Sequence, residues 1–247
     1  VIVLQTVAAN LGSILTPVGN PQNIFIYSYY GLPITDFILT TLPVWGISLV
    51  VLIVLSMLLP KKKIACEFKE KETLNTKLLV LYIVLFAVCL LVVCKVFEWW
   101  YMLGAVIVVL LIFDRKTLLK ADFFLLLTFV FFFIFSGNIA RIEAVDTFLG
   151  GILENNEILI GAATSQVISN VPATLLLSGF TENAKGLLLG VNIGGLGTPI
   201  ASLASLISFK LYSNAAGEKG SGFMGKFLAL NFALLFALLA LALFVLQ

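Results

Sequence analysis

Long apolar runs are the feature that most constrains the fold of this chain. Residues 34–59 read ITDFILTTLPVWGISLVVLIVLSMLL, and residues 223–246 form a second run of similar length. A helix needs roughly 20 apolar residues to cross the hydrocarbon core of a bilayer. Because every backbone N–H and C=O in hydrocarbon needs a partner inside the protein, such runs are stable there as helices. The sequence therefore predicts an all-α membrane protein.

The composition supports several spans rather than one anchored soluble domain. Of the 247 residues, 61% are hydrophobic and 11% are charged, whereas soluble domains carry about 25% charged residues. Further apolar runs cover residues 78–97, 101–113 and 122–136. Residues 137–157 are mixed and amphipathic, which is typical of a segment lying along the interface. We expect a multi-pass protein of the plasma membrane.

The basic residues predict the orientation of the spans. If the loops 60–77, 114–121 and 210–226 lie inside, twelve of the fifteen basic residues are cytoplasmic, as the positive-inside rule requires. The segment before residue 34 then crosses outward, and residues 186–212 cross inward. The net charge of the whole chain is only +2 and the basic residues are explained by topology, so nucleic acid is not an expected partner.

Two stretches repeat one another across the chain. Residues 10–30 align without a gap on residues 192–212, and the identities are Asn10 with Asn192, Gly12 with Gly194, Thr16 with Thr198, Pro17 with Pro199 and Tyr30 with Tyr212. Since the two copies cross in opposite senses, the sequence predicts the inverted repeats of many secondary transporters.

Glycine and proline in these copies predict broken transmembrane helices. The stretch GVNIGGLGTPIAS at 190–202 cannot maintain regular helical bonding, and freed backbone groups in hydrocarbon cost several kcal/mol each. The break must therefore face protein or a wet cavity, where carbonyls, Asn192 and Thr198 are hard donors for a small cation. The alternative is a glycine-rich kink that only permits close helix packing.

A re-entrant hairpin is predicted over residues 157–181. Two apolar arms of about 18 Å each, too short to span, flank SNVP at 169–172. The tip at Ser169–Asn170 would present a helix N-terminus, which attracts anions. No acidic residue occurs in 1–30, 158–181 or 186–212, which also favours an anionic substrate. A single proline-kinked span is the alternative.

These predictions divide the chain into three parts. Residues 1–59 hold the end of the first inverted repeat, and residues 60–77 form a cytoplasmic basic loop. Residues 78–247 hold the second repeat, with scaffold spans, the hairpin, the broken helix 186–212 and the last span 223–246. We expect the chain to be the C-terminal part of a longer permease that does not transport on its own.

Three motifs, ANLGSILTPVGNPQN, SQVISNVPATLLLSGF and GVNIGGLGTPIASLASL, make the chain resemble the ion transporter superfamily of citrate and dicarboxylate carriers, sodium-coupled divalent-anion symporters and arsenite permeases. The resemblance implies an elevator-type homodimer in which each hairpin tip and the broken helix after it form the site. Carried over to matching positions, the substrate and ion site comprises Ser169, Asn170, Asn192, Gly194, Gly195, Thr198, Asn10, Gly12, Ser13, Thr16 and Asn20.

The resemblance also bears on cofactors and contacts. It implies no cofactor beyond a coupling Na⁺ ion, for which the backbone of Gly194, Gly195 and Ser169 is the candidate site. The tip reads Ser-Asn-Val where the dicarboxylate symporters have Ser-Asn-Thr, so no substrate contact from Val171 is implied.

The leading functional hypothesis is a secondary carrier of a small anion, with citrate or another di- or tricarboxylate as substrate and a cation as coupling ion. Arsenite or oxyanion efflux is the alternative. An intramembrane enzyme is not expected, because such enzymes need a nucleophile with a base, paired acids or a metal cluster. Histidine is absent, and Ser169 has no basic residue within its hairpin.

Overall fold

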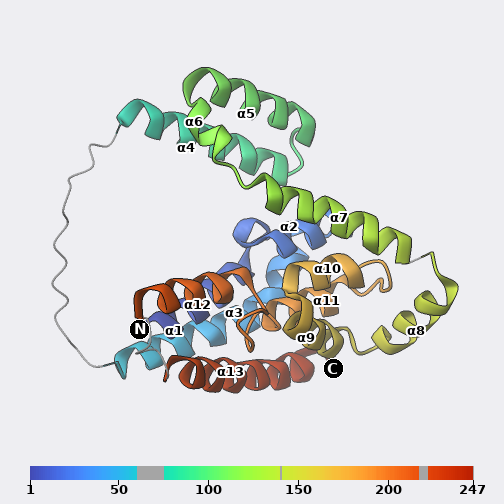
Figure 1. The fold of residues 1–247 in the computed structure, drawn as a ribbon. Helices are drawn as coiled ribbons and strands as arrows, with labels where there is room; N and C mark the ends of the chain where they lie inside the picture. Colours follow the sequence, from blue (N-terminus) through green and yellow to red (C-terminus); the bar gives the residue numbers. More distant parts are fainter. Residues whose placement is uncertain (60–74, 140, 217–221, 247) are drawn as a thin grey trace. The chain divides into compact units, whose positions relative to one another are not determined.

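The computed structural model describes residues 1–59, 75–139, 141–216 and 222–246. Most of the predicted basic loop 60–77, and residues 217–221 of the last one, lie outside this part. Every regular element in the described ranges is a helix, which confirms the all-α class. Figure 1 shows the helices, whose bounds are α1 Ile2–Gly12, α2 Pro21–Tyr29, α3 Ile34–Met57, α4 Thr76–Val93, α5 Trp99–Phe113, α6 Arg115–Leu119, α7 Phe123–Ile139, α8 Glu143–Leu153, α9 Glu157–Ile168, α10 Asn170–Leu177, α11 Ala184–Ile193, α12 Leu203–Ala216 and α13 Phe223–Leu246.

Three of the described helices, α3, α4 and α13, are long and apolar enough to cross a membrane. A fourth candidate arises if α7 and α8, which are bent against one another, count as one span. The chain divides into two compact units, one of residues 1–59 with 128–247 and the other of residues 60–127. The two aligned stretches, residues 10–30 and 192–212, lie in the first unit.

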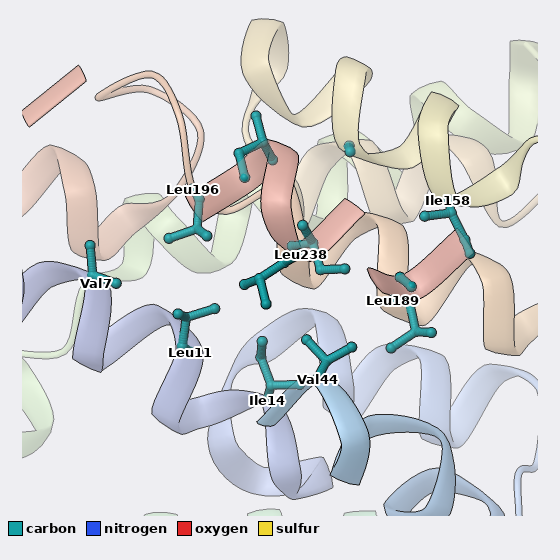
Figure 2. Packing of buried hydrophobic residues seen from close by; sticks show 12 residues of the cluster. Val7, Leu11, Ile14, Val44, Ile158, Leu189, Leu196 and Leu238 are labelled. Carbon is teal, nitrogen blue, oxygen red and sulfur yellow. The ribbon is translucent and has the colours of Figure 1, made fainter. Parts of the chain in front are cut away.

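The core of the first unit surrounds α11. Nine of the ten residues of α11 are buried, and its side chains Leu189 and Ile193 pack with residues of α1, α3, α9 and α13. Figure 2 shows Val7, Leu11 and Val44 within this cluster. A helix that is apolar on all sides is stable only when its neighbours enclose it, so α11 is held in place by helices from both ends of the chain.

Both repeated segments interrupt their helices, as the sequence predicts. After α1 the chain forms two short 3₁₀ turns, Ser13–Leu15 and Pro17–Gly19, before α2 starts. After α11 the chain is irregular until α12 begins at Leu203. Gly197 has φ +102° there, a left-handed conformation that glycine adopts without steric cost.

Matching caps start the second half of each broken helix. The Asn20 side chain accepts from the backbone N–H of Asn23 at 2.8 Å, and the Ser202 hydroxyl accepts from the N–H of Ser205 at 3.1 Å. Such caps satisfy one of the free N–H groups at a helix start. The alignment of Asn10 with Asn192 also pairs these two caps, Asn20 with Ser202 and Asn23 with Ser205.

The chain turns sharply between α9 and α10. Ser169 ends α9 with φ 75°, and α10 starts at Asn170 and returns along α9. At the open end of this pair, Glu157 accepts from the Thr181 hydroxyl and from the Asn183 amide, each at 3.0 Å. The placement of this hairpin as a re-entrant element in a membrane stays a prediction.

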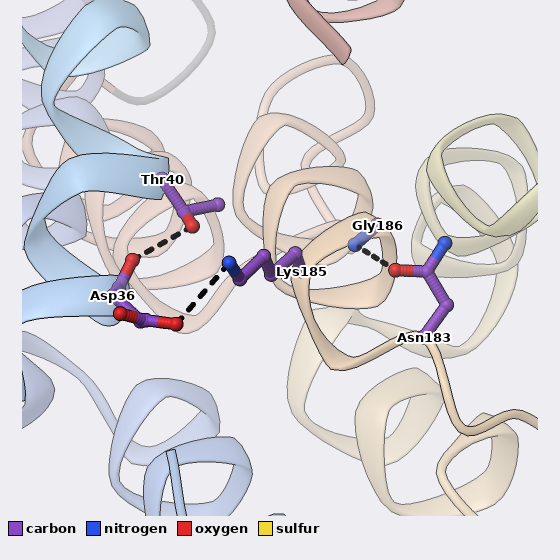
Figure 3. A network of polar contacts seen from close by, with 5 residues as sticks. All are labelled: Asp36, Thr40, Asn183, Lys185 and Gly186. Atoms are coloured by element: carbon purple, nitrogen blue, oxygen red, sulfur yellow. Dashed lines mark hydrogen bonds and ion pairs between the residues drawn. The ribbon is translucent and has the colours of Figure 1, made fainter. Parts of the chain in front are cut away.

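An ion pair joins the starts of α3 and α11. Lys185 Nζ lies 3.3 Å from Asp36 Oδ2 (Figure 3), and both side chains are nearly half exposed. Asn183 caps α11 by accepting from the N–H of Gly186 at 2.9 Å. The start of the second broken helix is therefore tied to the span that follows the first one.

Candidate functional site

The two breaks and the hairpin turn enclose a small polar cavity. Its volume is about 160 Å³. The lining residues come from α1, the first break, the start of α2, the tip of α10 and the start of α12, and they are Ala9, Asn10, Ser13, Gly19, Asn20, Pro21, Gln22, Asn170, Val171, Ser202, Leu203 and Ala204. The lining side chains are amides, hydroxyls and small apolar groups, and none of them is ionisable.

Three helix N-termini meet at this cavity. The lining includes the first two residues of α2, of α10 and of α12. The first turn of a helix carries free N–H groups and a partial positive charge of about half an elementary charge, so anions are stabilised there. Half-helix N-termini directed at one point are the arrangement by which broken-helix transporters hold anionic groups.

Asn170 is a lining residue whose side-chain amide has unused hydrogen-bonding capacity within the described ranges. Its backbone N–H donates to Ala201 O at 2.9 Å, which ties the tip to the second break. Its side chain is 4% exposed, yet within the described ranges no protein group donates to or accepts from its amide. Because Asn170 lines the cavity, its amide is available for a ligand there. Val171, for which the resemblance implied no role, lies beside it in the lining.

Asn10 connects the first repeat to the second by hydrogen bonds. Its side-chain amide donates to Gly195 O at 3.1 Å and to Ser205 Oγ at 3.3 Å. Ser13 Oγ in turn donates to Asn10 O at 2.8 Å and accepts from the Asn20 amide at 3.2 Å. Three predicted residues, Asn10, Ser13 and Asn20, are therefore brought together on one wall of the cavity.

Asn192 makes the reciprocal connection below the cavity. It is buried, and its amide donates to Asn23 Oδ1 at 2.7 Å and to Leu188 O at 2.8 Å. Its oxygen accepts from the amide of Asn20 at 3.0 Å and from that of Gln22 at 3.4 Å. The alignment of the repeats pairs Asn192 with Asn10 and Asn23 with Ser205. The contact between Asn192 and Asn23 in one direction therefore corresponds to the contact between Asn10 and Ser205 in the other.

Gly194, Gly195, Thr198 and Ser169 lie behind the cavity wall, where they hold the second break. A Cβ on Gly194 would lie 2.7 Å from the Cα of Ala162, so this glycine permits close packing on α9. Thr198 donates from Oγ1 to the backbone O of Gln166 at 3.0 Å. Ser169 Oγ donates to Ala201 O at 3.4 Å.

Gly12 and Thr16 are exposed and do not line the cavity. Gly12 instead lines a separate apolar groove between α1 and α3, which has a volume of about 500 Å³. The Thr16 carbonyl, rather than its side chain, takes part in the break by accepting from the Asn23 amide at 3.0 Å. The structure thus does not place these two side chains with the other predicted site residues.

Five polar residues at the breaks were missed from sequence, namely Gln22, Asn23, Gln166, Ser202 and Ser205. Each breaks the apolar pattern of its segment, a signal that was present in GNPQN, in TSQV and in IASLAS. The alignment would also have found Ser202 and Ser205 as partners of Asn20 and Asn23. Their importance becomes visible only through long-range contacts.

A helical membrane protein whose two broken helices and hairpin turn enclose a polar cavity has the architecture of a solute transporter. The chain belongs to the citrate transporter family, whose family model matches residues 1–185. This finding confirms the predicted resemblance and the multi-pass membrane location, and the family to which the chain belongs is one of transporters rather than enzymes, as expected.

Two curated relatives support the assignment. The chain is 37% identical over 237 residues to the uncharacterized transporter MJ0456 of Methanocaldococcus jannaschii. This match covers 93% of the present chain and 61% of MJ0456. It is 32% identical over 219 residues to the inner membrane protein YbiR of Escherichia coli, covering 85% and 58%. The chain thus spans about 60% of the length of these relatives. No solved structure matches the chain.

Proposed function

We propose that the protein is a secondary carrier of a small carboxylate anion, with citrate or another di- or tricarboxylate as substrate. The observation that carries this proposal is the convergence of the N-termini of α2, α10 and α12 on an uncharged polar cavity. Several separate carboxylate groups on one substrate can each face a different N-terminus. The unpartnered Asn170 amide adds a donor between them.

Arsenite efflux, the second candidate, fits this cavity less well. Arsenite is uncharged at neutral pH, so converging helix N-termini give it little advantage. Its strongest protein ligands are thiolates, and the cavity lining contains no cysteine. The printed description of the family model, citrate transporter, agrees with the carboxylate proposal.

Coupling to cations follows from the charge of the substrate. Moving one elementary charge across 100 mV involves about 2.3 kcal/mol, so a polyanion enters a negative interior only with accompanying cations.

For the movement itself we propose an elevator mechanism. Support comes from the bonds of Asn170 and Thr198 between the hairpin and the second break, since they favour movement of both as one body. The homodimer rests on the family resemblance.

Equilibrium binding to the purified chain in lipid nanodiscs tests the proposal. We expect citrate and succinate to bind, and Asn170→Leu to weaken binding about 10- to 100-fold, because a lost hydrogen bond to a charged group is worth about 1.5–3 kcal/mol. Gly12→Ala, outside the cavity, serves as the matched control. Binding of arsenite but not of the carboxylates, or equal binding by the Asn170→Leu variant, would contradict the proposal.

A further inference from the structure

We infer that two side-chain amides, those of Gln166 and Asn23, stand in for cations at the carbonyl groups freed by the two helix breaks. Each break releases several backbone carbonyls, and such oxygens are the groups that bind Na⁺ in broken-helix transporters. In this protein an amide nitrogen lies at the centre of each group of oxygens. The inference concerns the breaks and holds for any transported anion.

Gln166 closes the second break. Its Nε2 lies 2.8 Å from Gly194 O, 3.0 Å from Leu196 O and 3.1 Å from Ala162 O. These three oxygens come from the break and from α9, so they surround the nitrogen from two elements. The NH₂ group thereby supplies donors to the two break carbonyls, Gly194 O and Leu196 O, for which no other donor lies within the described ranges, and such groups are costly to leave unpaired in a water-poor region.

The neighbours fix the orientation of this amide. The N–H of Thr198, which can only donate, lies 2.9 Å from Gln166 Oε1. Reversing the amide would place its oxygen against the three carbonyl oxygens and its nitrogen against that N–H. The nitrogen therefore faces the carbonyls, and its hydrogens supply the positive charge that a bound cation would supply.

Asn23 does the same for the first break. Its Nδ2 lies 3.0 Å from Thr16 O, 3.1 Å from Ile14 O and 3.2 Å from Ser13 O. Its oxygen accepts from Asn192 Nδ2, whose own direction is fixed by Leu188 O. The two amides come from different elements, one from the hairpin and one from α2, yet each meets three carbonyls.

The carbonyls of the predicted sodium site are therefore already bonded. Gly194 O accepts from Gln166, and Gly195 O accepts from Asn10 Nδ2. At the tip, Ser169 O accepts from the N–H of Ala173 at 2.9 Å. A sodium ion at the centre of the oxygens that Gln166 meets would occupy the position of its amide nitrogen, so we propose that the breaks keep their shape without one.

Replacing the nitrogen by a carboxylate oxygen should convert the amide position into a cation site. In Gln166→Glu an anionic oxygen would face three carbonyl oxygens, and a cation would relieve the repulsion. We expect this variant to melt roughly 5 °C below wild type in choline chloride and to recover at least half of that loss in sodium chloride of equal concentration. The wild-type melting temperature should differ by less than about 1 °C between the two salts.

Gln166→Met is the matched control, because it removes the donor without adding a charge. It should lose stability equally in both salts. Sodium stabilisation of the wild-type chain by several degrees would overturn the inference, as would a Gln166→Glu variant that is equally unstable in both salts. If Gln166→Glu does not fold, Asn23→Asp tests the first break in the same way, and the wild-type sodium titration still decides.

Discussion

The two helix breaks share a sequence pattern but differ in what holds them. The first break is partly open, with Thr16, Val18 and Gly19 exposed, whereas residues 194–197 of the second are buried. Asn23 supports the first break from 7 to 10 residues away along the chain. Gln166 supports the second from 28 to 32 residues away.

The hairpin covers the second break. Helix α9 packs on one face of α11, where an added Cβ on Gly190 would lie 2.6 Å from Ile158 O. The alignment places Ala8 at the position of Gly190, and Ala8 lines the open apolar groove instead. Among the described residues, Asn23 of α2 therefore supports the first break, while α9 supports and covers the second.

Asn192 makes three side-chain hydrogen bonds from the second broken helix to residues of the first. Its replacement should therefore have the largest effect on stability. Within the described ranges, Asn192→Leu leaves Asn23 Oδ1 and the buried Gln22 amide without a protein partner. We expect the free energy of unfolding to fall by about 3 kcal/mol, since each buried group left without a bond costs about 1–3 kcal/mol. Chemical unfolding in micelles measures this loss.

Asn231 provides the control for that experiment. It is also fully buried, but within the described ranges its Oδ1 has no hydrogen-bond partner, and its amide bonds only Phe227 O of its own helix. Asn231→Leu should therefore leave stability unchanged or raise it slightly. Equal losses in both variants would show that the network between the breaks contributes nothing specific.

Substitutions at the aligned glycines Gly12 and Gly194 test the difference between the two breaks directly. A Cβ at Gly194 would lie 2.7 Å from the Cα of Ala162 and 2.8 Å from Ser165 Oγ, whereas a Cβ at Gly12 meets nothing within 4 Å. We expect Gly194→Ala to cost about 2 kcal/mol through overpacking. Gly12→Ala should be neutral or gain up to about 1 kcal/mol from helix propensity. Similar thermal stabilities for the two variants would contradict the proposed difference.

The ion pair between Lys185 and Asp36 should have the smallest effect. Because both side chains are nearly half exposed, solvent screens their attraction, and pairs of this kind contribute about 0–1 kcal/mol. Asp36→Asn should lower stability by roughly 0.5 kcal/mol at low salt and by less at high salt. Unfolding at two salt concentrations measures both values, and a loss above 2 kcal/mol would assign the pair a structural role.

Much of the arrangement of spans and helix breaks could be predicted because it follows from local sequence patterns. The apolar runs gave α3 and α13, and the glycines and prolines marked both breaks. The partners of the freed carbonyls could not be predicted in the same way, since nothing adjacent to Gln166 or Asn23 indicates what each amide will meet. Gly12 and Gly194 are aligned glycines, but among the described residues only Gly194 has close neighbours, a difference that the alignment alone does not show.

Protection of one of two neighbouring positions by citrate tests the central claim most directly. Ser13 lines the polar cavity, while Gly12 lines the apolar groove on the other side of the same helix end. In a chain with Cys66, Cys89 and Cys94 replaced by alanine, Ser13→Cys and Gly12→Cys each provide one thiol for a membrane-permeant maleimide. We predict that citrate slows labelling at position 13 and leaves position 12 unchanged. Unchanged labelling at position 13, or equal protection of both, would contradict an anion site between the breaks.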